Sequence, residues 1–342
     1  MKKICFKVDS PYQNNQLFQE RGDLNFLFRV KKILENKNHI VGTQDIIDED
    51  EADIVIYLDY RKDFRSNEKK KVLLAMESIA VIPKTFEKNY TDKFDLTFTF
   101  YDKIVDNNKI FKLNYSYDLT PFSIIKFKNK YKLICNISSN KFSNHPKELY
   151  SKRIESIEYF ENSHKSEFDL YGFGWDQSFR FPNVYNLMKL FNQTKLTRQI
   201  IKTIKKIPKR LNPFLRNYST YAGTIKDKYE VLNKYKFSIC YENVSGVEGY
   251  ITEKIFDCFK CGVVPIYLGP KEISEHIPKN SFLDRRNFKN DEELYLFIKN
   301  MEENEYDSYR TAALSFLNSS ESNLFKSKVM APWFVEKILE VK

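Results

Sequence analysis

Short apolar runs alternate with amphipathic helical patterns along most of this 342-residue chain. In the first half, a helix is expected at 24–34, where the apolar residues fall on one face. Strands are expected at 4–8, 52–58, 72–76 and 94–100. Strands that alternate with helices build parallel sheets, because each helix carries the chain back to the edge where the next strand starts.

A second alternating series follows. It predicts strands at 131–137, 168–171, 237–241 and 263–268, and helices at 149–160, 252–261 and 292–301. Two such series predict an α/β protein with two Rossmann-like domains. Their boundary is expected within 107–130, which lacks clear periodicity. We therefore expect an N-terminal domain at 1–125, a C-terminal domain at 126–320 and a helical tail at 321–342.

Composition and missing motifs exclude several classes of protein. Hydrophobic residues make up 42% and charged residues 30%, which is typical of soluble globular proteins. The sequence has no 18-residue apolar stretch that could span a membrane. It also lacks GxGxxG after the first strand and GxxxxGK[ST] anywhere, which argues against dinucleotide enzymes and P-loop NTPases. The N-terminus reads as a strand rather than a signal peptide, so a cytoplasmic location is expected.

The five cysteines suggest free, buried thiols in a reducing compartment. Cys258 and Cys261 form a single CxxC motif without a second pair or a nearby histidine. We expect them to lie on a buried helix face rather than to bind a metal. The four histidines likewise show no metal-binding spacing. The acidic run at 48–51 is expected to be solvated.

Segment 195–216 contains eight Lys or Arg residues and no acid. Isoleucines at spacings of three and four make it an amphipathic basic helix up to Pro208. Two interpretations stay open. The segment attaches the protein peripherally to an anionic membrane surface or ligand, or it is a solvated helix docked by its isoleucines. No motif indicates binding to nucleic acid.

The segment Tyr235–Pro270 is the richest in functional signals. A buried strand leads into a loop with Gly246 and Gly249, and a helix then begins near Thr252. A helix N-terminus offers free N–H groups and the positive end of a dipole, and Lys254 adds a full charge. This combination suits a phosphate or diphosphate, and Glu253 can accept hydrogen bonds from sugar hydroxyls. The alternative is ordinary helix capping, with Lys254 solvated.

This segment resembles the donor-binding signature of glycosyltransferase family 10, the α1,3/4-fucosyltransferases. The matching motifs are Tyr241–Glu242–Asn243, Tyr250–Ile251–Thr252–Glu253–Lys254 and Val264–Pro265–Ile266 with Gly269. The resemblance implies a GT-B fold, in which two Rossmann-like domains face each other across a cleft. It also implies inverting transfer of L-fucose from GDP-fucose.

The resemblance also implies roles for individual residues. It assigns Asn243, Tyr250, Glu253 and Lys254 to the nucleotide-sugar site. A family arginine that contacts the diphosphate from an early helix of the donor domain is best matched by Arg153, although Lys152 is adjacent.

An inverting transferase needs a general base for the acceptor hydroxyl, and the family uses a glutamate of its N-terminal domain. Glu77 follows the expected strand at 72–76, so its position and the resemblance both favour it. Glu87 and Asp95 are the alternatives, and Glu77 can also be an exposed strand-end residue. Trp175 follows the strand at 168–171 and is expected either to stack on a sugar or base or to pack in a turn.

The expected donor is GDP-fucose, with no obligatory metal and at most stimulation by a divalent ion. By analogy with the family, the acceptor is an oligosaccharide or lipid-linked glycan, with α1,3 transfer to a GlcNAc- or glucose-type sugar of a bacterial surface polysaccharide. The enzyme would act in the cytoplasm or on the inner face of the cytoplasmic membrane. The alternatives are a GT-B enzyme with another nucleotide sugar and a non-enzymatic protein that binds membranes or anionic glycans.

Overall fold

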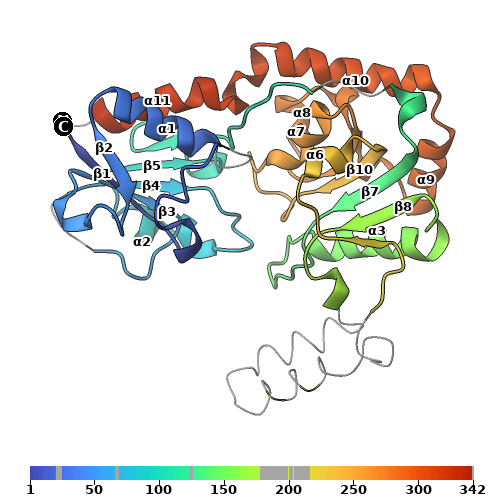
Figure 1. Ribbon diagram of the computed structural model, residues 1–342, viewed down its shortest axis with the longest axis horizontal. Coiled ribbons are helices and arrows are strands. Elements are labelled where there is room, and N and C mark those ends of the chain that lie inside the picture. Colours follow the sequence, from blue (N-terminus) through green and yellow to red (C-terminus); the bar gives the residue numbers. More distant parts are fainter. Residues whose placement is uncertain are drawn as a thin grey trace.

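The computed structural model describes residues 1–20, 25–65, 69–122, 126–177, 199, 203 and 216–340. Two α/β domains lie side by side, and the C-terminal helices run along one side of both (Figure 1). Each domain contains a six-stranded sheet with parallel pairing throughout. The prediction of two Rossmann-like domains is therefore confirmed.

The N-terminal sheet has the strand order β2-β1-β3-β4-β5-β6. Its strands are β1 (Lys3–Lys7), β2 (Ile40–Thr43), β3 (Ile54–Leu58), β4 (Lys70–Ala75), β5 (Leu96–Thr99) and β6 (Ile110–Lys112). Strand β3 is apolar at every position, since both faces of the sheet are covered. Ile54 and Ile56 enter one core cluster, whereas Val55 and Tyr57 enter the cluster on the opposite face.

The C-terminal sheet has the order β12-β11-β10-β7-β8-β9. Its strands are β7 (Lys132–Ile137), β8 (Phe168–Tyr171), β9 (Tyr221–Gly223), β10 (Tyr235–Tyr241), β11 (Val264–Leu268) and β12 (Leu283–Asp284). The chain proceeds outward from β7 in one direction and from β10 in the other. The order thus reverses between β7 and β10, and open α/β sheets bind ligands at the carboxyl ends of strands at such a point.

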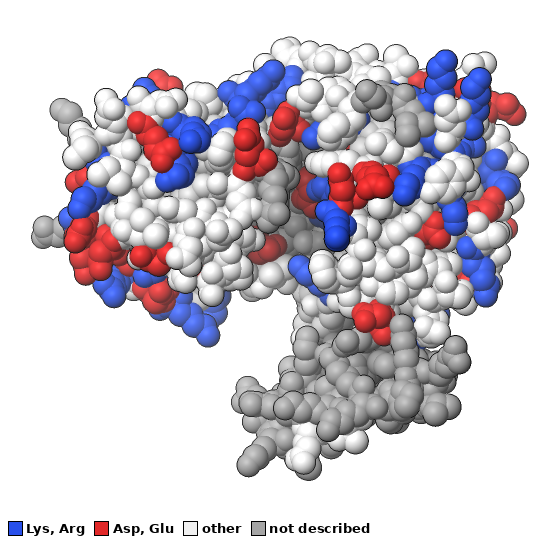
Figure 2. Space-filling model, viewed as in Figure 1, with Lys and Arg blue, Asp and Glu red and all other residues white. Residues whose placement is uncertain are grey.

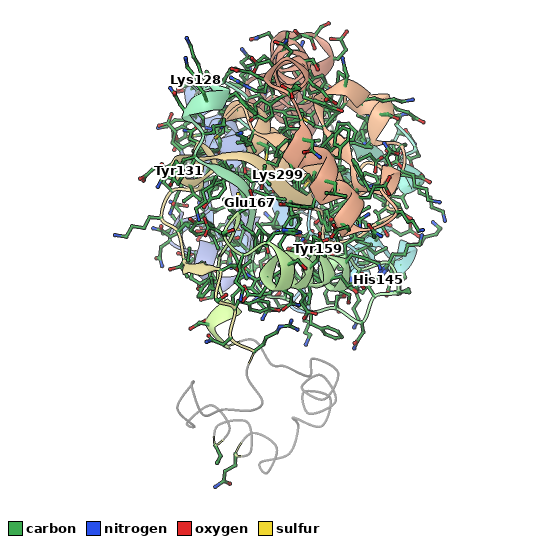
Figure 3. The ribbon with its side chains drawn as sticks, turned by 90° about the vertical axis from the view of Figure 1, so that its right-hand side faces the viewer. Lys128, Tyr131, His145, Tyr159, Glu167 and Lys299 are labelled. Carbon is green, nitrogen blue, oxygen red and sulfur yellow. The ribbon has the colours of Figure 1, made fainter. Side chains whose placement is uncertain are left out.

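Helices cover both faces of the sheets. Their bounds are α1 (Asn25–Asn36), α2 (Lys88–Thr91), α3 (Tyr150–Ser163), α6 (Lys228–Leu232), α7 (Glu253–Lys260), α8 (Ile273–His276), α9 (Asp291–Asn300), α10 (Glu303–Asn318) and α11 (Ser327–Glu340). Helices α3 and α9 pack on one face of the C-terminal sheet, and α7 packs on the other. On the α9 side, Glu167 and Lys299 form an ion pair, and Figure 3 shows the two residues close together.

Several short elements were not predicted from the sequence. Strands β2, β6, β9 and β12 are two to four residues long, which is too short for a periodic pattern to stand out. Strand β6 lies within the aperiodic segment 107–130 and still belongs to the N-terminal sheet. The crossing between the two sheets therefore lies between Lys112 and Lys132.

The expectation of a solvated acidic run at 48–51 is wrong for Glu49. Its side chain is buried and accepts a hydrogen bond from Lys7 Nζ at 2.8 Å, and the Tyr57 hydroxyl donates to the same carboxylate. The partners lie on β1 and β3, so sequence distance hid them. The prediction that the five thiols are free and buried is confirmed.

Helix α11 returns from the C-terminal domain to the N-terminal one. Figure 1 shows it lying beside α1, and its apolar residues, including Phe334, belong to the core cluster of the N-terminal sheet. The Phe334 ring lies 4.6 Å from that of Phe98 and 5.6 Å from that of Phe26. Ser327 Oγ donates to Asn25 Oδ1 at 2.6 Å. Segment 321–342 was expected to be a helical tail, and its helix α11 instead completes the core of the N-terminal domain.

A loop of the C-terminal domain packs into the N-terminal domain. Val244, Val247 and Tyr250 belong to the same core cluster as Val55 and Tyr57. Gly249 has a φ of +78°, and a Cβ there would lie 2.2 Å from the Phe100 carbonyl oxygen. Only glycine lets the two backbones approach this closely. The loop 244–250 therefore fixes the two domains against each other.

We expect Phe334→Ala to lower the free energy of unfolding by about 3–5 kcal/mol, because it removes a fully buried ring from the N-terminal core. Urea denaturation measures the effect. Leu324→Ala is the control, since Leu324 is 52% exposed and should change stability by no more than about 0.5 kcal/mol. Equal effects of the two substitutions would show that α11 is not part of the core.

We expect Gly249→Ala to destabilise the protein more than Gly246→Ala. Both glycines have positive φ, so both substitutions add about 1–3 kcal/mol of backbone strain. At Gly246, however, the nearest atom to a new Cβ is 3.6 Å away, in the flexible Lys147 side chain. Thermal denaturation compares the variants, and equal melting temperatures would contradict the close contact at Gly249.

Candidate functional site

A pocket of about 350 Å³ opens at the carboxyl ends of β7 and β10, where the strand order of the C-terminal sheet reverses. The predicted residues Arg153, Asn243, Glu253 and Lys254 all line it. They come from α3, from the loop after β10 and from the start of α7, so the fold brings together side chains that are far apart in the sequence. Tyr250 is not among the lining residues.

Arg153 is a buried cation, only 4% exposed. Its Nη2 donates to the backbone oxygens of Tyr241 at 2.6 Å and Glu242 at 3.2 Å, and its guanidinium lies over the Tyr150 ring. No carboxylate of the described residues forms a salt bridge with it. Burial lowers the pKa of Arg153, as expected for a charge removed from water. The pocket wall thus carries a positive charge without a direct counter-ion.

Lys254, the second residue of α7, is anchored by its neighbours. Its Nζ donates to Thr252 Oγ1 at 2.7 Å and to Glu242 Oε2 at 3.0 Å. Burial and the charge of Arg153 act to lower the pKa of Lys254, but the Glu242 and Glu253 carboxylates outweigh them and raise it. The capping alternative with a solvated lysine is therefore not what the structure shows.

Glu253 opens α7 and is about one-third exposed. Burial opposes its ionisation, but the charges of Lys254 and Lys228 outweigh this effect and lower its pKa to about 2. The carboxylate is therefore ionised at neutral pH and can accept hydrogen bonds from hydroxyl groups.

Asn243 and Tyr250 are linked to each other. Asn243 Nδ2 donates to the Tyr250 hydroxyl at 3.1 Å. The Tyr250 ring is buried and lies 5.0 Å from the ring of Phe100 in the N-terminal domain. Tyr250 therefore positions Asn243 and joins the two domains, although its own side chain does not line the pocket.

Glu77 lies just beyond β4 and is held by hydrogen bonds at both its backbone and its side chain. Asp59 Oδ1 accepts from the backbone N–H groups of Met76 at 2.8 Å and Glu77 at 2.9 Å, and Glu77 Oε1 accepts from Ser78 N at 2.7 Å. Burial raises the pKa of Asp59 to about 7, against the effect of these hydrogen bonds and with a contribution from the Glu77 charge. The carboxyl groups of Asp59 and Glu77 therefore lie near each other beyond the carboxyl ends of β3 and β4.

The Glu77 carboxylate acts electrostatically across the domain boundary. Burial raises the pKa of Tyr150 and Arg153 opposes the rise, while the Glu77 charge adds to it. Acidic and basic side chains gather where the two lobes meet (Figure 2). The N-terminal carboxylate therefore lies within electrostatic range of the pocket in the C-terminal domain.

The alternatives to Glu77 lie elsewhere. Glu87 is exposed and precedes α2. Asp95 is exposed at the amino end of β5, where it accepts a hydrogen bond from Lys71 N at 2.6 Å. The carboxyl ends of the strands, which face the pocket, are at the opposite edge of that sheet. Of the three acids, Glu77 is the one whose charge acts on Tyr150, a residue of the pocket lining.

Sequence reasoning missed Tyr115, a residue of the aperiodic segment 107–130. Its ring stacks on Phe100 with centroids 5.4 Å apart and meets Tyr250 edge-on. Burial raises its pKa, and Tyr250 and Glu77 add to the rise. Tyr115 thus contacts the donor loop through Tyr250 and lies within electrostatic range of Glu77. The segment offered no periodic pattern, so its sequence alone gave no signal.

Further predictions from the sequence concern Trp175, the basic segment 195–216 and membrane-spanning helices. Trp175 is 2% exposed and its Nε1 donates to the Ser138 carbonyl at 2.6 Å, so it packs in the turn and does not stack on a ligand. The basic segment 195–216 lies outside the described residues except for Gln199, Thr203 and Arg216. In the part of the chain that is described, no helix is long and apolar enough to cross a membrane.

Comparisons with known proteins agree with this arrangement. Residues 127–313 match the model of the C-terminal part of glycosyltransferase family 10 (fucosyltransferase). An α-(1,3)-fucosyltransferase of Helicobacter pylori is 33% identical over 110 residues, covering 32% of this chain and 22% of that protein. GDP-fucose protein O-fucosyltransferase 3 of Gallus gallus is 38% identical over 84 residues, covering 24% and 18% of the two chains. These matches span about a fifth of each relative's length.

Solved structures share the fold across the whole chain. A crystal structure of an α1,3-fucosyltransferase with GDP-fucose has a TM-score of 0.56 at 17% identity, and covers 100% of this chain and 91% of that one. Anabaena HepE in complex with UDP-glucose has a TM-score of 0.55 at 12% identity, and covers 100% of both chains. The family model covers more than half of the sequence, and the GT-B fold extends over all of it. The chain belongs to glycosyltransferase family 10, the fucosyltransferase family.

Proposed function

We propose that this protein transfers L-fucose from GDP-fucose to a hydroxyl group of a glycan acceptor, with inversion at the anomeric carbon. The observation that carries the proposal is the buried Arg153, which has no carboxylate partner among the described residues and lies at the wall of a pocket with Lys254. A buried unpaired charge is costly, so this arrangement calls for an anionic ligand. A nucleoside diphosphate supplies that charge.

The reaction is a single displacement. Glu77 takes the proton of the acceptor hydroxyl, and the acceptor oxygen attacks the anomeric carbon of fucose. The bond from that carbon to the β-phosphate oxygen breaks, and GDP leaves. Arg153 and Lys254 stabilise the charge that develops on the diphosphate. Glu253 is ionised and accepts hydrogen bonds from hydroxyl groups of the bound donor.

Two further parts of the proposal concern metal and acceptor. Arg153 and Lys254 do the work that a divalent cation does at other diphosphate sites, so a metal at most stimulates turnover. The acceptor is an oligosaccharide or lipid-linked glycan of a surface polysaccharide, with α1,3 transfer to a GlcNAc- or glucose-type sugar. The enzyme acts in the cytoplasm or at the inner face of the membrane. A GT-B enzyme with another nucleotide sugar is the second candidate, because the basic residues of the pocket favour a diphosphate but do not select a particular sugar or base.

We expect Arg153→Met to weaken GDP binding by about 10- to 150-fold, since hydrogen bonds to charged groups contribute roughly 1.5–3 kcal/mol. Methionine keeps the apolar stem and removes the charge. Lys152→Met is the matched control, because its neighbouring side chain is 60% exposed and pairs with Glu155. Isothermal titration calorimetry gives both dissociation constants. Equal affinities of the two variants would remove Arg153 from the diphosphate site.

We expect Glu77→Gln to reduce turnover by about 10²–10⁴-fold while GDP affinity stays within about twofold of the wild type. Glutamine keeps the size of the side chain but cannot take a proton at neutral pH. Release of GDP from GDP-fucose in the presence of an oligosaccharide acceptor measures the rate, and Glu87→Gln is the exposed control. Retention of more than about a tenth of wild-type turnover would exclude Glu77 as the general base.

A further inference from the structure

Glu242 is a carboxylate with no exposed surface, at the end of β10. It does not line the pocket, and no site role was assigned to it from the sequence. Burying a carboxylate is costly unless it is paired and hydrogen-bonded. Glu242 has both compensations. Its neighbours Tyr241 and Asn243 both line the pocket, so the buried charge lies directly behind the pocket wall.

All the polar partners described for the Glu242 carboxylate belong to the donor motif or to the next strand. Oε1 accepts from Thr252 N at 2.8 Å and from the Tyr267 hydroxyl at 3.3 Å. Oε2 accepts from Thr252 Oγ1 at 2.8 Å and from Lys254 Nζ at 3.0 Å. The carboxylate therefore fixes both the residue before α7 and the lysine in its first turn.

The Lys254 ammonium has three N–H donors, and Glu242 and Thr252 accept two of them. One donor is left for a ligand. The lysine lines the pocket, and its side chain is 23% exposed, so that donor can reach a phosphate oxygen. The buried pair thus restricts the ammonium to one orientation.

Glu242 also balances the charge of Lys254. Three other groups act on this ammonium: Glu253 on α7, Tyr250 on the preceding loop and Arg153 on α3. Arg153 has the same sign as Lys254, and Glu253 lies farther away than Glu242, at 3.6 Å. Burial lowers the pKa of Lys254, but Glu242 and Glu253 outweigh it and raise the pKa above its ordinary value. Without Glu242, the more distant Glu253 would be left to offset the charge of Lys254 beside the like-charged Arg153.

We propose that Glu242 is a positioning residue that keeps Lys254 charged and directs its free N–H toward the diphosphate. This inference rests on the proposed function, because it takes GDP as the ligand. The carboxylate never touches the donor, and it acts through the lysine. A purely structural role would affect the stability of the protein but not the pH dependence of GDP binding.

The test is the dissociation constant for GDP between pH 7.5 and 9.5, measured by calorimetry. In the wild type, Lys254 stays charged, so affinity should change by no more than about twofold. In Glu242→Gln, the lysine keeps only the more distant Glu253 carboxylate as a counter-charge, so its pKa falls. It then releases its proton as the pH rises, and the affinity of the variant should fall at least fivefold more than that of the wild type. Glu242→Asp keeps the carboxylate charge but at a greater distance from Lys254. Its loss of GDP affinity with rising pH should therefore lie between that of the wild type and that of Glu242→Gln.

Two further variants separate the proposed role from general destabilisation. Glu161→Gln alters another buried carboxylate, which accepts four hydrogen bonds from Ser219 and Thr220 and does not line the pocket. It should lower the melting temperature and keep the wild-type pH profile. Lys254→Arg in the Glu242→Gln background should restore a flat profile, because a guanidinium does not lose its proton in this range.

The outcomes distinguish the two claims. A wild type that does not bind GDP would overturn the proposed function. A wild type that binds GDP, with both Glu242 variants following its pH profile, would overturn the positioning role and leave the donor assignment intact. If Glu242→Gln does not fold, Glu242→Asp is compared with Glu161→Gln instead. A GDP affinity that stays constant with pH in both variants would contradict the positioning role of Glu242.

Discussion

The loop that carries the donor motif is also part of the core of the other domain. Val244, Val247 and Tyr250 pack with residues of β3 and β4, and Gly249 lets the loop backbone meet the Phe100 carbonyl. This contact sets the distance between the strand ends of the two sheets. The pocket in the C-terminal domain and Glu77 in the N-terminal domain face one boundary because this loop joins them. The site therefore depends on interdomain packing as much as on its own residues.

Charge distribution at the pocket follows from two different ways of burying a cation. Lys254 is paired with the buried Glu242, whereas the partners of the Arg153 guanidinium among the described residues are backbone carbonyl oxygens and the face of Tyr150. The first cation is oriented and nearly neutralised before any ligand arrives. The second is left with its charge available. A diphosphate then meets one preset hydrogen-bond donor and one cation that has no salt-bridge partner among the described residues, which suits a leaving group that gains negative charge during transfer.

Much of this arrangement can be predicted from the sequence. Apolar runs longer than four residues and an amphipathic helix such as α1 leave periodic signals, so the two sheets and most of their helices follow from pattern alone. The motif around Lys254 can also be recognised in the sequence, because its residues are consecutive. Arg153 and Glu77 follow from a resemblance together with their positions near strand and helix ends.

What the sequence could not predict depends on contacts between distant segments. Tyr115 lies in a segment without periodicity, and its role comes from stacking against Phe100 and Tyr250. Glu49 looks like one acid in a solvated run until Lys7 is found beside it. Glu242 was visible in the motif, but nothing in the sequence shows that its side chain turns inward to Lys254. In each case tertiary packing determines the environment of the side chain, and local propensities contain no information about such contacts.

We propose that the pocket at the carboxyl ends of β7 and β10 holds the diphosphate of GDP. Thermal denaturation of the full-length protein with GDP, UDP or dTDP at equal concentrations tests it most directly. A ligand at 100 times its dissociation constant stabilises the folded state by about 2.7 kcal/mol, which raises the melting temperature by a few degrees. We expect this shift for GDP and a much smaller one for UDP and dTDP. Equal shifts with all three would contradict the GDP assignment, and no shift with any of them would contradict a diphosphate site.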